Sequence, residues 1–107
     1  GDNAIIAQYS QDNLDVLTTE LSLTSDQVTQ IQALNEKVVQ KIQAIQNNTE
    51  MDESKKREFI RGNRDDHKRV MSTILSPEQF TAYTELMKAK ASDRTEERIQ
   101  HNEIKTN

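Results

Sequence analysis

Residues 23–47, LTSDQVTQIQALNEKVVQKIQAIQN, decide the fold class of this chain. Their apolar side chains recur every three or four positions, the spacing that gathers side chains on one face of an α-helix. The apolar positions are Val28, Ile31, Leu34, Val38, Ile42 and Ile45, with Val39 beside them. The pattern predicts an amphipathic helix from Ser25 to about Asn47, which would be about 35 Å long.

Three more helices are predicted around this one. A single helix with an irregular apolar stripe is expected over residues 3–21, and a fourth over residues 77–91. The third, over residues 53–74, carries its apolar side chains on one face. These are Ile60, Val70, Met71 and Ile74, with His67 among them and Phe59 beside them. After Ser92 the sequence is polar, so we expect one helical domain over residues 1–92 and a partly disordered tail over residues 93–107.

Local signals refine the ends of these helices. Asn47, Asn48 and Thr49 are expected to mark the turn after the second helix, because asparagine tolerates the left-handed conformation at helix ends. Asp52 or Thr49 is the expected N-cap of the third helix. Gly62 lies inside that helix, where it costs about 1 kcal/mol, and it could mark close packing or a bend.

Composition supports an all-α fold of three to four helices, dominated by a long antiparallel helical hairpin. The 107 residues include only two glycines and one proline, too few for a β-fold with many tight turns. Apolar residues make up 33%, so a single core is thin and we expect a homodimer to cover exposed apolar faces. No apolar run approaches the roughly 20 residues of a membrane span, so no membrane insertion is expected.

One pattern occurs twice, 52 residues apart, at the starts of the second and fourth helices. LTSDQ spans residues 23–27 and LSPEQ spans residues 75–79. In each copy a hydroxyl residue is the expected N-cap and the glutamine three positions later completes a capping box. The leucine before each cap is expected to pack on the fourth helical residue as a hydrophobic staple. The motif residues are Leu23, Thr24, Gln27, Leu75, Ser76 and Gln79. This reading alone requires no ligand.

The doubled motif resembles the LTxxQ-motif family of periplasmic proteins, of which Spy and CpxP are familiar members. The resemblance covers about residues 21–91; the first copy fits in full, and the second has serine for threonine. It implies a curved antiparallel homodimer in the periplasm, acting without catalysis as an ATP-independent chaperone or an envelope-stress modulator. Its partners would be unfolded or envelope proteins. The resemblance also implies a secreted precursor whose signal peptide has been removed. The chain begins with Gly1 rather than Met, so the absence of a signal peptide from this sequence is uninformative.

Charge is distributed unevenly along the chain. The net charge is −4, which disfavours nucleic acid as a partner and departs from the basic chaperone members of the resembled family. Within residues 53–74, however, four basic residues recur at spacings of four, three and four, and so form one stripe beside the apolar face. This basic stripe consists of Arg57, Arg61, Arg64 and Lys68. It is our hypothesis for a client-binding surface, because positive charge speeds encounter with acidic partners.

The alternative for the basic stripe is a solvated helix face with local ion pairs. Arg57 could pair with Glu53, Arg61 with Asp65 or Glu58, and Lys68 with Asp65. Such exposed pairs contribute about 0–1 kcal/mol and imply no partner.

The sequence offers little for catalysis or metal chemistry. The chain has no cysteine, and therefore no disulfide and no thiolate ligand. Asp65, Asp66 and His67 are adjacent on a helix, where neighbouring side chains diverge by about 100°, and His101 is far away in sequence. We therefore expect a non-enzymatic protein without a cofactor. Two alternatives stay open: a zinc-type metal-responsive regulator, as among relatives of the resembled family, and a purely structural helical module.

Overall fold

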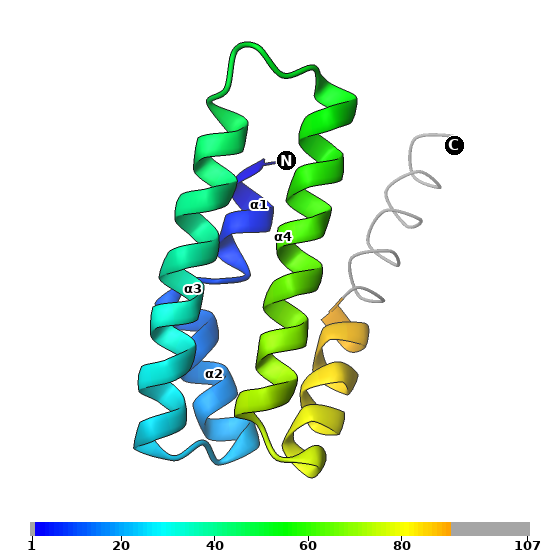
Figure 1. Cartoon of the computed structure of the whole chain (residues 1–107). Coiled ribbons are helices and arrows are strands. Elements are labelled where there is room, and N and C mark those ends of the chain that lie inside the picture. Colours follow the sequence, from blue (N-terminus) through cyan, green and yellow to red (C-terminus); the bar gives the residue numbers. More distant parts are fainter. Residues whose placement is uncertain (1, 91–107) are drawn as a thin grey trace, which may run out of the picture.

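The computed structural model describes residues 2–90, which are folded into helices without a β-strand. Four labelled helices follow one another: α1 (Asp2–Ala7), α2 (Gln11–Leu21), α3 (Ser25–Gln46) and α4 (Glu53–Ile74). A further helix covers residues 77–90 (Figure 1). The predicted all-α class is therefore confirmed, whereas the tail predicted over residues 93–107 lies outside the described part of the chain.

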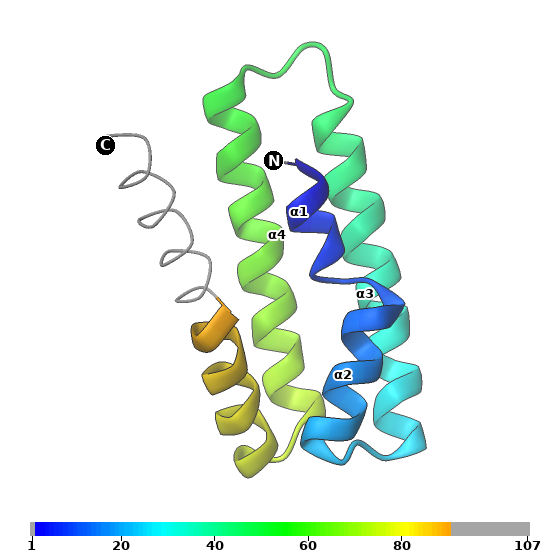
Figure 2. The same ribbon diagram turned by 180° about the vertical axis from the view of Figure 1, so that it is seen from behind.

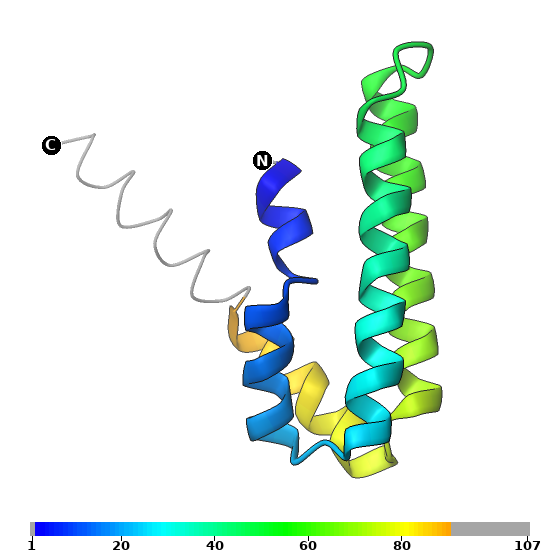
Figure 3. The ribbon, with the colours of Figure 1, turned by 90° about the vertical axis from the view of Figure 1, so that its left-hand side faces the viewer.

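The long helices α3 and α4 form the predicted antiparallel hairpin, each with 22 residues (Figure 1). α1 and α2 lie over one face of this hairpin (Figure 2), and the side view shows the helix over residues 77–90 on the same side (Figure 3). The molecule thus has two layers, with the hairpin as one layer and the three shorter helices as the other.

Two apolar clusters hold the layers together. One lies at the base of the hairpin and joins α2, α3, α4 and the helix over residues 77–90. Its buried members are Leu14, Leu17, Leu21, Ile31, Met71, Leu75 and Tyr83. The other lies further along the hairpin, where Val38 and Ile42 of α3 meet Ile60 of α4, with Ile5, Ile6 and Tyr9 packed against them. The short helix α1 therefore covers the hairpin where the helix over residues 77–90 does not reach.

The prediction of a single helix over residues 3–21 is wrong, because the helix is interrupted between Ala7 and Gln11 and forms α1 and α2 instead. Ser10 is an N-cap whose side-chain oxygen accepts a hydrogen bond from the backbone N–H of Asn13 at 3.2 Å. The Asn13 side chain then donates to the carbonyl of Ala7 at 3.0 Å. These two side chains satisfy backbone groups on both sides of the break, which is how serine and asparagine compete with a continuous helix.

The structure also decides three expectations about helix ends and Gly62. Asn47 is right-handed, with φ −87° and ψ −2°; the left-handed residue is Ser22, with φ 52°, at the end of α2. Asp52, not Thr49, is the N-cap of α4, and its side chain accepts from the Lys55 N–H. A Cβ added at Gly62 would meet nothing within 4 Å, so this glycine does not mark close packing.

Candidate functional site

The two LTxxQ-type motifs form matching caps at the base of the hairpin. The Gln27 N–H donates to the Thr24 hydroxyl at 3.1 Å, and the Thr24 N–H donates to the Gln27 side-chain oxygen at 3.0 Å. Ser76 and Gln79 repeat both bonds at the start of the helix over residues 77–90, at 3.1 and 3.0 Å. Both expected capping boxes are therefore present. The staple residues Leu23, Val28, Leu75 and Phe80 all belong to the cluster at the base of the hairpin.

The two glutamines also bind each other, which the sequence analysis missed. Gln27 Nε2 donates to Gln79 Oε1 at 2.7 Å, and Gln79 Nε2 donates to Gln27 Oε1 at 3.2 Å. Each amide nitrogen also donates to the end of the helix before the other motif: Gln27 to the Ile74 carbonyl and Gln79 to the Leu21 carbonyl, both at 3.1 Å. Helix ends leave such carbonyls without intrahelical partners, so each motif caps the other's preceding helix.

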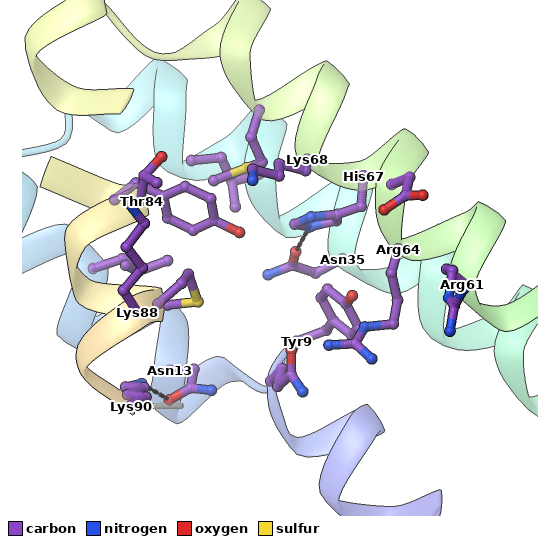
Figure 4. Close-up of a pocket in the computed structure, with 17 residues that line it drawn as sticks. Tyr9, Asn13, Asn35, Arg61, Arg64, His67, Lys68, Thr84, Lys88 and Lys90 are labelled. Atoms are coloured by element: carbon purple, nitrogen blue, oxygen red, sulfur yellow. Dashed lines mark hydrogen bonds between the residues drawn. The ribbon is translucent and has the colours of Figure 1, made fainter. Parts of the chain in front are cut away.

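A cavity of about 510 Å³ lies between α2, α4 and the helix over residues 77–90 (Figure 4). Its floor is apolar and belongs to the cluster at the base of the hairpin. The floor residues are Leu17, Ile31, Met71, Tyr83 and Met87. The chain forms this cavity because the turn at residues 75–76 brings residues 77–90 back beside α2. We call this space the interlayer cavity.

Three members of the basic stripe line the interlayer cavity. Arg61, Arg64 and Lys68 lie along its α4 side, whereas Arg57 lies on the same stripe but does not line it. Lys88 and Lys90 come from the helix over residues 77–90, and Asp65 is the one acidic side chain of the lining. Lys90 donates to the Asn13 side-chain oxygen at 3.1 Å (Figure 4). Helices distant in sequence thus contribute positive charge to one space.

The local ion pairs considered for the basic stripe are not formed. Among residues 2–90, ion pairs join Lys56 to Glu53 at 3.8 Å and Arg69 to Asp66 at 3.5 Å. Both involve basic residues outside the stripe, whose own four side chains belong to exposed residues. The stripe is therefore exposed to solvent, with Arg64 lying beside Tyr9.

A buried polar pair lies beside the cavity and links the two long helices. His67 of α4 and Asn35 of α3 are 5% and 7% exposed, and His67 Nε2 lies 2.7 Å from Asn35 Oδ1. Because Asn35 Oδ1 is an acceptor, His67 Nε2 carries the proton. The Tyr9 ring meets the His67 ring edge-on, with centroids 4.6 Å apart. Burial lowers the pKa of His67 to about 4, so the imidazole is neutral at pH 7.

The two tyrosines of the cavity keep their protons as well. Burial raises the pKa of Tyr83 to about 12, and Tyr9 contributes to this shift in the same direction. Burial also raises the pKa of Tyr9, although the neighbouring Arg64 guanidinium acts in the opposite direction. Both phenol groups can therefore donate hydrogen bonds at neutral pH.

Neither metal chemistry nor a membrane span is supported within residues 2–90. No three His, Cys, Asp or Glu side chains come together there as metal ligands. His101 lies outside this part of the chain. No helix among these residues is long and apolar enough to cross a membrane. The expected absence of catalysis stays a prediction.

Comparison with known proteins places the chain in a family. The model of DUF4890, a domain of unknown function, matches residues 7–83, and the chain belongs to this family. The match includes both LTxxQ-type motifs and most of the interlayer cavity lining. No curated protein and no solved structure matches the chain significantly.

Proposed function

We propose that this DUF4890-family chain is a non-enzymatic, protein-binding protein of the periplasm, similar in action to the Spy/CpxP-like proteins that its doubled motif resembles. It would hold unfolded or envelope proteins on its helical surface, as an ATP-independent chaperone or a stress modulator. The observation that carries this proposal is the basic stripe of α4, whose four side chains make no ion pair among residues 2–90.

The stripe combines two properties that suit capture of extended acidic chains. Its charges are exposed, so they attract an acidic client over the Debye length, which is about 30 Å at 0.01 M salt and about 8 Å at 0.15 M. Apolar surface lies beside them, because Met87 of the neighbouring helix is only partly buried and lines the same cavity as Arg61, Arg64 and Lys68. Charge would then set the rate of encounter, and apolar contact the residence time.

The test reverses charge on the stripe in the full chain. The double variant Arg61→Glu/Arg64→Glu should capture reduced α-lactalbumin, an acidic client, more slowly and therefore suppress its aggregation less than the parent does. This loss of suppression should be larger at 0.01 M than at 0.15 M salt. The matched control Lys37→Glu/Lys41→Glu makes the same change of charge at exposed positions of α3 and should behave like the parent. Equal suppression by both double variants and the parent at low salt would refute the proposal.

A further inference from the structure

We propose that the interlayer cavity binds a single-chain amphiphile with an anionic head group. This ligand is a small molecule and is distinct from the protein clients proposed above, so the proposed ligand site does not depend on that function. The proposal rests on three properties of the cavity: an apolar floor, two hydrogen-bond donors that reach the cavity, and an excess of positive charge.

The floor is suited to an alkyl chain. Ile31 and Met71 close the cavity from beneath but are 0% exposed, so the apolar surface that a ligand can reach is that of Leu17, which is 7% exposed, and of its neighbours in the lining. Met87, which is partly buried, adds an unbranched, adaptable wall. The volume of about 510 Å³ falls within the range of roughly 300–1,000 Å³ typical of small-molecule pockets. A folded partner would be too large to enter such a space.

Two hydrogen-bond donors of mostly buried residues, Asn35 and Tyr83, line the same cavity. The oxygen of the Asn35 amide is used by His67, but its Nδ2 group makes no hydrogen bond among residues 2–90. The Tyr83 hydroxyl likewise has no partner within that part of the chain. These residues are 7% and 8% exposed. Neither polar group is sealed from solvent. Both groups reach the cavity and are therefore available to a ligand that supplies hydrogen-bond acceptors.

The charge of the cavity selects the ligand's head group. Arg61, Arg64 and Lys68 approach from α4 and Lys88 from the helix over residues 77–90, against the single carboxylate of Asp65. Tyr9, Asn35 and Arg64 border the same open space, with the Asn13–Lys90 contact across from them (Figure 4). A carboxylate or phosphate offers only acceptors and negative charge, which complements donors and guanidinium groups together. A cationic head group would meet repulsion instead.

Calorimetric titration of the full chain tests the site with dodecanoate and dodecyl phosphate, each below its micellar concentration. Both anions should bind more tightly than dodecyltrimethylammonium, and the tighter of the two identifies the head group. Arg64→Gln should weaken binding about tenfold or more, because it removes a charged hydrogen bond. The matched control Arg57→Gln removes the same charge from the same stripe outside the cavity and should change affinity less than twofold.

A second variant, Tyr83→Phe, and NMR spectra of the Asn35 side chain test the site independently of Arg64. Tyr83→Phe should weaken anion binding about threefold to tenfold, since it deletes only a hydroxyl. In NMR spectra, dodecanoate should shift the Asn35 side-chain amide signals. Equal losses with Arg57→Gln and Arg64→Gln, or equally tight binding of the cationic amphiphile, would overturn the site.

The two proposals can also fail separately. Arg57→Glu should slow client capture without changing the affinity for dodecanoate. Tyr83→Phe should weaken dodecanoate binding without changing the rate of client capture. An effect of Tyr83→Phe on client capture as large as its effect on dodecanoate binding would contradict a separate ligand site.

Discussion

At the scale of single residues, the buried pair of His67 and Asn35 makes the fold sensitive to acid. The pair joins α3 to α4 through a 2.7 Å contact between residues that are 7% and 5% exposed. The charged groups that line the adjoining cavity are Asp65 and five basic residues: Arg61, Arg64, Lys68, Lys88 and Lys90. Tyr9 and Tyr83 are the remaining titratable neighbours, and both stay neutral at acid pH. A proton on His67 would therefore be buried beside more positive than negative charge.

We predict that the stability of the fold decreases as the pH falls from about 6.5 to about 4. The pKa of His67 is lowered from 6.5 to about 4, so the unfolded chain takes up the proton first and unfolding is favoured across this window. A shift of this size corresponds to about 3 kcal/mol. The measurement is urea unfolding of the parent and of His67→Gln, which keeps a donor for Asn35 but does not titrate. The stability difference between the two proteins should move in favour of the variant at low pH. Parallel pH profiles would contradict the prediction.

At the scale of elements, the two glutamines connect four helix ends in one hydrogen-bond network. Each glutamine closes its own capping box, pairs with the other glutamine and caps a distant helix C-terminus. The local half of this arrangement follows from the sequence, because capping depends on residues three positions apart. The other half does not, because it requires knowing that the chain brings residues 27 and 79 together.

We predict that Gln27→Ala and Gln79→Ala each destabilise the fold by about 1–3 kcal/mol, because each leaves partly buried polar groups unpaired. Thr24→Ala and Ser76→Ala lose only a cap and should cost about 0.5–2 kcal/mol. In a double-mutant cycle, the two glutamine variants should couple by at least about 0.5 kcal/mol. Urea unfolding measures all of these values, with Gln30→Ala on the exposed face of α3 as the control. Additive losses would show that the pair makes no joint contribution.

The same distinction explains which other features could be predicted from the sequence. The long helices follow from apolar periodicity, and Asp52 from cap chemistry. The helix boundary at Ser10 was missed because the apolar stripe continues across it into α2. The capping bond of Ser10 is local, but the prediction followed the stripe. The basic stripe was found from helical spacing alone. That Arg61 lines a cavity and Arg57 does not depends on where residues 77–90 pack, which no local pattern encodes.

At the scale of the whole molecule, the two-layer arrangement leaves one face of the hairpin uncovered by the described helices (Figure 3). Phe59 of α4 is 48% exposed and borders a shallow groove with Gly62 and Asn63. Its position on α4 differs from that of the basic stripe. The apolar composition of 33% predicts a thin core, and the exposed Phe59 ring is one apolar side chain that this core does not bury.

We therefore predict that the protein is a homodimer whose melting temperature rises with protein concentration, because association stabilises the folded state by mass action. Well above the dissociation constant, each tenfold increase in concentration should add about 1.4 kcal/mol per dimer. Calorimetric melting across a hundredfold range of concentration measures this, with sedimentation giving the mass. If Phe59 lies in the interface, Phe59→Ala should flatten the concentration dependence. The control Val16→Ala alters a side chain of similar exposure, 45%, on α2 and should not. A constant melting temperature together with a monomeric mass at high concentration would exclude the dimer, and the interlayer cavity would then be the main candidate for an apolar binding surface.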